Sequence, residues 1–419
     1  MPAQDPKLPA RHLRASDLRA IARLVTKAIT GVTRVVEGVH QSVWSTLGAP
    51  GGKMPGETRG LTGLVYRSIV GVTQGVGNGL DAVLTALQPW LEAGDDARIR
   101  SPQSEAAIAA LNGVLGDHLR ASGNPFATPM SLRYRGAALD WRSMPAMPDA
   151  TSKVLVLVHG LCMNDLQWRA EHDGGTVDHG EALAAALGYT PIYLRYNSGL
   201  HVSQNGNELA AELEHLTAHW PVPIEEISVV AHSMGGLLAR SAVHTARETN
   251  RQWPSRLRHL VFLGTPHHGA PLERAGNRLD DMLGSTRYTA PLASLGQLRS
   301  AGITDLRYGH VLDQDWEGHD RFRRQPDARR IVPLPAGVAC HAMAACTAAA
   351  RSPLADRLIG DGLVPLHSAL GRHGDVGRSL AFPKSSQSIA YRMNHMQLLS
   401  DPRVTRQLLH WLTPTANYG

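Results

Sequence analysis

The chain has 419 residues, a length that allows one large hydrophobic core and a second, smaller unit. Hydrophobic residues make up 43% of the chain, as in ordinary folded proteins, and the formal net charge is only +6. No nucleic-acid-binding module is recognisable, so we expect no nucleic-acid partner. The three cysteines form no disulfide pattern, and neither a signal peptide nor a membrane-spanning run is visible. These features predict a cytoplasmic protein.

The first 130 residues are predicted to form a helical region that contains an internal repeat. Apolar residues at helical spacing occupy residues 18–47 and 61–91, and the two segments match each other at an offset of 40. A third helix is expected over residues 105–121. The valine-rich faces of the repeat leave two interpretations open. They cover the rest of the chain or a second copy in a homo-oligomer, or they contact a membrane or lipid surface, which would make the protein peripheral to the membrane.

A buried strand followed by a glycine-containing loop is predicted after this region. Residues 154–158 are a continuous aliphatic run, which is typical of a strand buried on both faces of a parallel sheet. His159, Gly160 and Leu161 follow the run. A glycine at this point leaves room for a backbone N–H to face a substrate. We therefore predict that the N–H of Leu161 binds the oxyanion of a tetrahedral intermediate.

The pattern strand, sharp turn, helix is predicted around Ser233. The apolar run at residues 227–231 leads directly into His-Ser-Met-Gly-Gly at residues 232–236, and helix-forming residues follow at once. Such a turn holds a serine hydroxyl away from the backbone, and small residues two positions before and after the serine let strand and helix approach closely. Ser233 is the predicted nucleophile, and the N–H of Met234 is the predicted second oxyanion donor.

An acid and a histidine follow Ser233 in the order that this kind of turn predicts. Asp361 lies between two glycines and before Leu-Val-Pro, a context typical of an exposed turn. His395 lies between a predicted strand at residues 388–391 and a predicted amphipathic helix at residues 398–412. Each of the three residues stands at the end of an element. We therefore predict that Asp361 orients His395 and that His395 takes the proton of Ser233.

Five stretches together resemble α/β-hydrolases of the lipase/esterase type, and the resemblance covers residues 131–412. They are residues 157–161, 231–236, 263–269, 360–365 and 394–395. The resemblance implies an α/β fold with a mostly parallel sheet and helices on both faces. It implies a catalytic domain at residues 131–419, with a lid or cap insertion at about residues 270–337. No cofactor or metal is implied. Some lipases bind calcium through an aspartate two residues after the catalytic histidine, but this chain has Gln397 there.

Two further segments leave alternatives open. The stretch Thr-Pro-His-His-Gly at residues 265–269 is interpreted as a structural loop after a strand, with support of the site by His267 or His268 as the alternative. The other segment is interpreted as a polar surface loop, with metal binding as the alternative. Its candidate ligands are His310, Asp313, Asp315, His319 and Asp320.

The predicted function is hydrolysis of carboxylic esters, with a small-molecule acyl ester or lipid as the substrate. Ser233 attacks the ester carbonyl while His395, oriented by Asp361, takes the serine proton, and water then hydrolyses the acyl-enzyme. One alternative is an acyltransferase that uses the same residues. Another is a lipid- or partner-binding protein on a hydrolase scaffold. Acyl chain length, the alcohol portion of the substrate and the oligomeric state are left open by the sequence.

Overall fold

The computed structural model describes residues 102–121, 123–124, 126–144, 147–172, 175–270, 300–319, 327–349 and 360–413. The described residues from Ile108 onward form one compact unit, and residues 102–107 belong to a second unit. The predicted helical repeat and residues 271–299 and 320–326 of the predicted lid lie outside the described residues. The predicted division at residue 130 stays a prediction, although Ile108–Ala121 lies in the same unit as the sheet.

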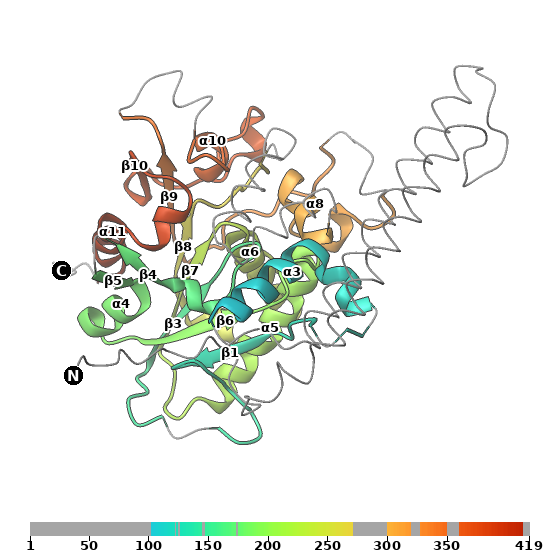
Figure 1. Ribbon diagram of the computed structural model, residues 1–419. Coiled ribbons are helices and arrows are strands. Elements are labelled where there is room, and N and C mark those ends of the chain that lie inside the picture. The colour runs from blue at the N-terminus through green and yellow to red at the C-terminus, as the bar shows by residue number, and fades with distance from the viewer. Residues whose placement is uncertain are drawn as a thin grey trace, which may run out of the picture. The chain divides into compact units, whose positions relative to one another are not determined.

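An eight-stranded sheet, in the order β10-β9-β8-β7-β3-β6-β1-β2, runs through the larger unit (Figure 1). The six strands from β10 to β6 in this order are parallel to their neighbours, whereas β1 runs antiparallel to β6 and β2 antiparallel to β1. The strands are β1 (Ser131–Tyr134), β2 (Ala137–Ala138), β3 (Lys153–Val158), β6 (Thr190–Arg195), β7 (Glu226–His232), β8 (Leu257–Leu263), β9 (Ala339–Cys346) and β10 (Gln387–Tyr391).

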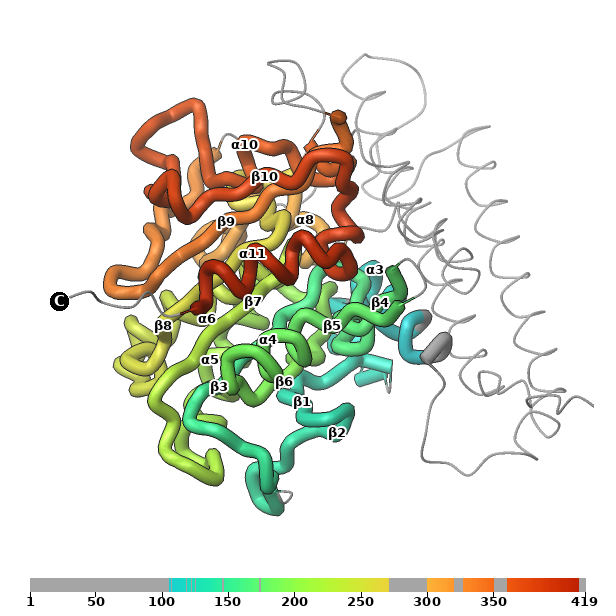
Figure 2. Tube along the Cα trace, turned by 90° about the vertical axis from the view of Figure 1, so that its left-hand side faces the viewer, coloured from blue at the N-terminus to red at the C-terminus, as the bar shows by residue number. Residues whose placement is uncertain are grey.

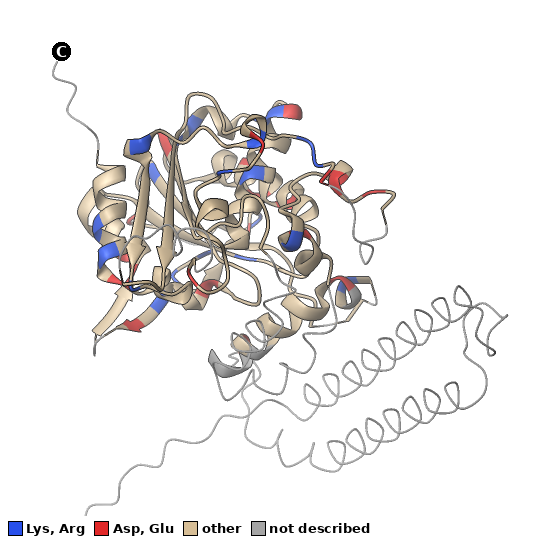
Figure 3. Cartoon of the chain, turned by 90° about the horizontal axis from the view of Figure 1, so that it is seen from above, with Lys and Arg blue, Asp and Glu red and all other residues tan. Residues whose placement is uncertain are grey.

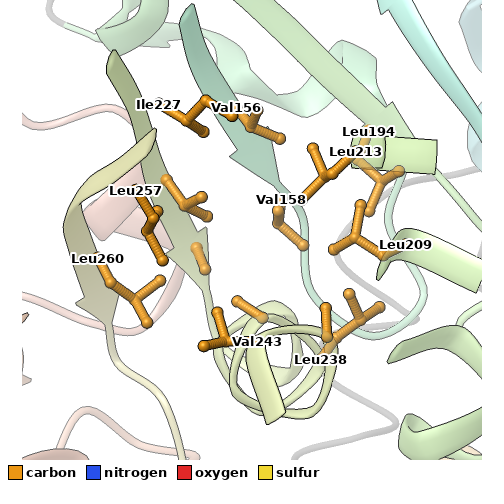
Figure 4. Packing of buried hydrophobic residues seen from close by; sticks show 14 of the residues in the cluster. Val156, Val158, Leu194, Leu209, Leu213, Ile227, Leu238, Val243, Leu257 and Leu260 are labelled. Carbon is orange, nitrogen blue, oxygen red and sulfur yellow. The ribbon is translucent and has the colours of Figure 1, made fainter. Parts of the chain in front are cut away.

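Helices cover both faces of this sheet because the side chains of a strand alternate between its faces. Val154, Val156 and Val158 of β3 share one hydrophobic cluster with side chains of α5 (Val202–His219) and α6 (Met234–Glu248). Figure 4 shows Val156 and Val158 in this cluster. Leu155 and Leu157 face the opposite cluster, which includes α4 (His179–Leu187) and α11 (Pro402–Leu412). Figure 2 shows α4 and α11 over the same face. The predicted α/β fold with a mostly parallel sheet is thereby confirmed.

Smaller elements connect these layers. Strands β4 (Arg169–His172) and β5 (Gly175–Asp178) form a separate antiparallel pair. The other elements are α3 (Pro102–Ala121), η1 (Asp165–Trp168), η2 (Trp253–Arg256), α8 (Ala301–Tyr308), η4 (Asp313–Asp315), α10 (Leu366–Ala369), η5 (Val376–Arg378), η6 (Lys384–Ser386) and η7 (Met396–Leu399). Helix α3 therefore begins three residues before the predicted helix at 105–121 and ends at the same residue.

The last helix begins later than the sequence pattern predicts. The apolar spacing predicts a helix from residue 398, but α11 starts at Pro402. The Asp401 side chain accepts the Arg403 N–H and thereby caps the helix, and proline suits the first helical position because it has no N–H to satisfy. Residues 396–399 form a separate 3₁₀ turn. Leu398 and Leu399, which precede the cap, are buried, but they belong to that turn.

Charged residues of both signs are interspersed along the described elements (Figure 3). Within the described ranges, none of the helices combines the length and hydropathy needed to cross a membrane. The three cysteines are free and buried, and Cys340 and Cys346 both lie on β9.

Candidate active site

The carboxyl ends of five parallel strands bring the predicted site residues to one edge of the sheet. Ser233 follows β7 directly, the loop from His159 to Leu161 follows β3, and Gly264 follows β8. Asp361 comes after β9, and His395 comes four residues after the end of β10. Because β9, β8, β7 and β3 are consecutive neighbours in the sheet, segments far apart in the chain meet here. Ligands of open α/β sheets bind at this edge.

Ser233 occupies a strained turn between β7 and α6. Its φ of 55° and ψ of −125° lie in a region that non-glycine residues rarely adopt. The residue stands at the N-cap position of α6, where serine commonly accepts a backbone N–H, but its side chain makes no capping hydrogen bond. The turn therefore leaves the hydroxyl oxygen free of the local backbone, which is what a nucleophile requires.

Close packing holds this turn. The Ser233 N–H donates to the carbonyl of Leu263 at 2.8 Å, which ties the turn to the end of β8. A Cβ atom on Gly235 would overlap the carbonyl oxygen of His159 and lie 2.6 Å from that of Val158. Glycine is therefore required at this position if α6 is to start against the end of β3.

Asp361 and His395 form a buried hydrogen-bonded pair. His395 Nδ1 donates to Asp361 Oδ2 at 2.6 Å, and the backbone N–H of His395 donates to the carbonyl of Asp361 at 3.1 Å. The other carboxylate oxygen, Oδ1, accepts the N–H groups of Leu363 at 2.9 Å and Val364 at 2.7 Å. Both side chains are buried. The carboxylate is thus fixed on one oxygen by its own turn and presents the other to the imidazole, leaving His395 Nε2 as the nitrogen that can accept a proton.

His232 connects this pair to the serine turn. It immediately precedes Ser233, and its ring packs against the ring of His395 with centroids 4.6 Å apart. Its Nε2 donates to the carbonyl of His395 at 3.2 Å. Burial, followed by the proximity of His395, holds the pKa of His232 well below its usual range, so this ring stays neutral. The sequence around His232 predicts no role for it, because nothing in the local pattern shows which way its side chain points.

Gly264 and Gly160 lie against the side chains of His395 and Ser233, respectively. A Cβ atom on Gly264 would be 3.1 Å from His395 Nδ1, and one on Gly160 would be 2.9 Å from the Cβ of Ser233. The structure therefore gathers the predicted Ser233, Asp361, His395 and the Gly160–Leu161 loop into one cluster. Among the described hydrogen bonds, none joins Ser233 Oγ to His395. Such bonds commonly tighten when substrate binds.

The predicted oxyanion donors lie at the same place. Met234 is the first residue of α6, and Leu161 directly follows the glycine that packs on Ser233. Both residues are buried. Met234 thus directly follows Ser233, and Leu161 lies one residue after the glycine that contacts Ser233. Their role as oxyanion donors stays a prediction.

The two histidines of the 265–269 stretch contact other parts of the fold. The ring of His267 packs on Phe262 and lies 3.5 Å from a guanidinium nitrogen of Arg240. His268 Nε2 donates to the carbonyl of Gly371 at 3.1 Å. These contacts agree with a structural loop, the first of the two interpretations.

Two of the candidate metal ligands of residues 310–320, His310 and Asp315, have side chains that form hydrogen bonds within the protein. Asp315 accepts backbone N–H groups of Val311 and Leu312, and His310 Nδ1 donates to Asp305 at 3.1 Å. Asp320 lies outside the described residues. No cluster of three or more potential metal ligands occurs in the part of the chain that the structure describes.

Buried neutral histidines make the stability of this region depend on pH. Burial lowers the pKa of His159 from 6.5 to about 4 and also holds the pKa values of His232 and His267 well below their usual range. Between pH 6.5 and 4 the unfolded chain therefore binds protons that the folded chain does not. Stability is complete above pH 6.5 and is lost as the pH falls. We expect His159 alone to lower the free energy of unfolding by about 2 kcal/mol between pH 7 and pH 5, measured by urea denaturation.

His341 offers a control for this pH effect. Its ring is stacked on Trp411, both ring nitrogens lack hydrogen-bond partners in the described contacts, and burial lowers its pKa to about 4. His341→Phe keeps an aromatic ring and removes the titrating group. The variant should be at least as stable as wild type at pH 7 and should lose less stability on acidification. Equal losses in both proteins would mean that buried histidines do not set the acid sensitivity.

Known proteins resemble the part of the chain that contains the serine turn. Residues 149–332 match the family model of the PGAP1-like alpha/beta domain, and no curated protein matches the chain. Among solved structures, the mature lipase BlEst2 of Bacillus licheniformis is 18% identical, with a TM-score of 0.41 over 68% of this chain and 98% of its own.

Two further solved structures are similar to this chain. The RedJ thioesterase of the Streptomyces coelicolor prodiginine pathway is 17% identical, with a TM-score of 0.36 over 66% of this chain and 95% of its own. The esterase Pf2001 of Pyrococcus furiosus is 12% identical, with a TM-score of 0.34 over 63% and 83%. The mostly parallel sheet with helices on both faces confirms the predicted α/β fold, and the serine turn after β7 and the family match over residues 149–332 agree with the expected resemblance to α/β-hydrolases.

Proposed function

We propose that the protein is a serine hydrolase that cleaves carboxylic esters with lipid-like acyl chains through an acyl-enzyme on Ser233. The observation that carries the proposal is the position of the buried His395–Asp361 pair. The His395 ring of this pair packs on the ring of His232. His232 directly precedes Ser233, whose hydroxyl forms no capping hydrogen bond with α6. A neutral imidazole backed by a carboxylate is the base that a serine nucleophile needs.

The reaction would begin when Ser233 Oγ attacks the ester carbonyl carbon while His395 Nε2 takes the hydroxyl proton. The charge that develops on the carbonyl oxygen is stabilised by the N–H groups of Leu161 and Met234, and Asp361 stabilises the imidazolium. The tetrahedral intermediate then expels the alcohol, which receives the proton from His395. Water, activated by the same histidine, attacks the acyl-enzyme and releases the carboxylic acid. Every step uses groups of this chain and needs no cofactor.

The surroundings of the site support an acyl rather than a polar substrate. A Cβ atom on Gly160 would lie 3.4 Å from Met163 Sδ, and one on Gly264 would lie 2.8 Å from Leu398 Cδ1. Thioether and aliphatic groups thus lie close to both reacting side chains. Met396, the residue after His395, is 38% exposed. Of these apolar groups, the exposed Met396 could contact an acyl chain, and each methylene removed from water contributes about 0.8 kcal/mol.

A panel of p-nitrophenyl esters tests the substrate class. We expect kcat/KM to rise by at least about tenfold from acetyl to octanoyl or longer chains, since each buried methylene adds to binding in the transition state. Rates should be measured below the solubility limit and micelle concentration of each ester. Equal or faster turnover of acetyl esters would contradict the lipid-like assignment and leave a short-chain esterase.

The same panel separates hydrolysis from acyl transfer. Product analysis in the presence of added alcohols or thiols shows whether the acyl group goes to water or to the acceptor. An excess of transesterified product at low acceptor concentration would indicate an acyltransferase. A wild-type protein whose Ser233 fails to react with a fluorophosphonate probe would instead favour a lipid- or partner-binding protein on a hydrolase scaffold.

A further inference from the structure

We propose that helix α3 is a positioning element of the active site. In this proposal Gly113 of α3, together with Ser198, fixes Cys162 and thereby aims the N–H of Leu161 at the oxyanion. The inference rests on the proposed function, because it assigns the helix to the oxyanion-binding loop of that site. It concerns Ile108–Ala121, which lies in the same compact unit as the sheet.

Cys162 is the strained residue of the oxyanion loop. It has a φ of 60°, which puts a non-glycine residue in the left-handed region, and it immediately follows Leu161. Its N–H donates to Ser198 Oγ at 3.0 Å, and both residues are buried. That hydrogen bond fixes the peptide between Leu161 and Cys162, so the orientation of Leu161 depends on it. Strained backbone of this kind persists only where its surroundings hold it.

Gly113 supplies the opposing contact. A Cβ atom on Gly113 would overlap Cys162 Sγ and would lie 2.8 Å from both Cys162 N and Cys162 Cα. The helix backbone therefore lies directly against the strained residue. Glycine in the interior of a helix costs about 1 kcal/mol relative to alanine, and here it permits the helix to reach the loop. The carbonyl of Gly113 is itself held in place, because it accepts a hydrogen bond from Ser300 Oγ at 2.7 Å.

The loop after β6 locks helix and oxyanion loop together. Asn197 Nδ2 donates to the carbonyl of Gly116 at 2.9 Å, and a Cβ atom on Gly116 would lie 2.7 Å from Asn197 Cγ. Asn197 Oδ1 accepts the N–H of Gly199 at 3.0 Å, which places Ser198 between two fixed residues. The serine that holds the Cys162 N–H is therefore itself oriented by α3.

The same loop reaches the second oxyanion donor. The N–H of Gly302, in α8, donates to the carbonyl of Gly199 at 3.1 Å. A Cβ atom on Gly302 would lie 3.0 Å from Met234 Cε. Figure 1 shows α3 and α8 on the α6 side of the sheet. One continuous set of contacts thus runs from α3 through residues 197–199 to Cys162, the residue after Leu161, and to the side chain of Met234, whereas Asp361 and His395 are held by other contacts.

Ser198→Ala tests the proposal without adding atoms. Ser228→Ala is the matched control, because Ser228 is also a buried serine that makes hydrogen bonds, but it lies near the start of β7, away from the site. We expect Ser198→Ala to lower kcat for an ester about 10- to 100-fold with KM changed less than twofold, since a misaligned donor weakens only transition-state binding. The inhibition constant of a trifluoromethyl ketone, whose adduct places an oxyanion in the same site, should rise by the same factor.

A second readout does not depend on activity. Hydrogen exchange of the peptide that contains residues 159–163 should become at least about tenfold faster in Ser198→Ala but not in Ser228→Ala. Gly113→Ala should show the same pattern from the helix side. If Gly113→Ala does not fold, the comparison of Ser198→Ala with Ser228→Ala still tests the proposal.

Two outcomes would overturn the proposal. The first is that Ser198→Ala leaves kcat, the inhibition constant and the hydrogen-exchange rate at their wild-type values. The second is that Ser198→Ala changes only KM. A wild-type protein that hydrolyses no ester and resists the fluorophosphonate probe would refute the proposed function instead. The exchange measurement would then still show whether α3 and Ser198 hold the loop.

Discussion

Replacing Ser233 by alanine is expected to lower kcat/KM for any ester substrate by at least about 10⁴-fold while leaving the protein folded. The serine oxygen is the only group proposed to form a covalent bond with substrate. Its removal should cost little stability, because the hydroxyl is not used to cap α6. Activity should be measured with the best ester of the panel, and stability by thermal unfolding monitored by circular dichroism. His395→Ala should cause a loss of similar size, since the hydroxyl is a weak nucleophile without a base.

Ser241→Ala is the matched control for this experiment. Ser241 is a buried serine on α6, and its hydroxyl has no hydrogen-bond partner in the described contacts. The control should retain activity within about twofold, since it lies away from the reacting groups. Substantial ester hydrolysis by Ser233→Ala, in a preparation free of contaminating esterases, would show that another residue attacks the substrate.

Asp361→Asn is expected to lower kcat by about 10³- to 10⁴-fold with little effect on folding, a loss equal to or smaller than that of Ser233→Ala. An asparagine oxygen can still accept the N–H groups of Leu363 and Val364, as Asp361 Oδ1 does. Its amide nitrogen would then face His395 Nδ1, where the carboxylate now accepts a hydrogen bond at 2.6 Å. The histidine would have to carry its proton on Nε2 and could no longer take one from Ser233.

Asp375 is the appropriate control, because it is another acid in the same part of the sequence. It accepts the N–H of Gly377 and lies 3.8 Å from Arg378 Nε. Asp375→Asn should therefore leave turnover unchanged. The reverse result, near wild-type turnover in Asp361→Asn and loss in Asp375→Asn, would mean that Asp375 or another acid orients His395 during catalysis.

The sequence allowed the serine turn to be predicted because all of its determinants are local. A buried strand, a serine flanked by small residues and a helix lie within about twenty consecutive residues, and the structure has β7 and α6 as expected. The contact between Asp361 and His395 required in addition that β9 and β10 be neighbours. The order of the residues along the chain suggested that Asp361 and His395 pair, but only the three-dimensional arrangement brings them to hydrogen-bonding distance.

The parts that could not be predicted depend on contacts between distant segments. Gly113 in a helical pattern indicates only a slightly weaker helix, and nothing near it in sequence points to Cys162. The start of α11 was misplaced because apolar periodicity continues across Asp401, where capping decides the boundary. The helical repeat of the first hundred residues lies outside the described residues, so its role stays a prediction.

The burial of the three thiols has a practical consequence for spectroscopic work on this protein. Cys162, Cys340 and Cys346 are 8%, 6% and 0% exposed, and burial raises the pKa of Cys162 and of Cys340 to about 12. Because thiolate, not thiol, reacts with maleimides, the native cysteines are poor targets at neutral pH. A reporter dye can therefore be attached to a cysteine introduced at an open position such as Val376, which is 85% exposed, with the native sequence otherwise intact.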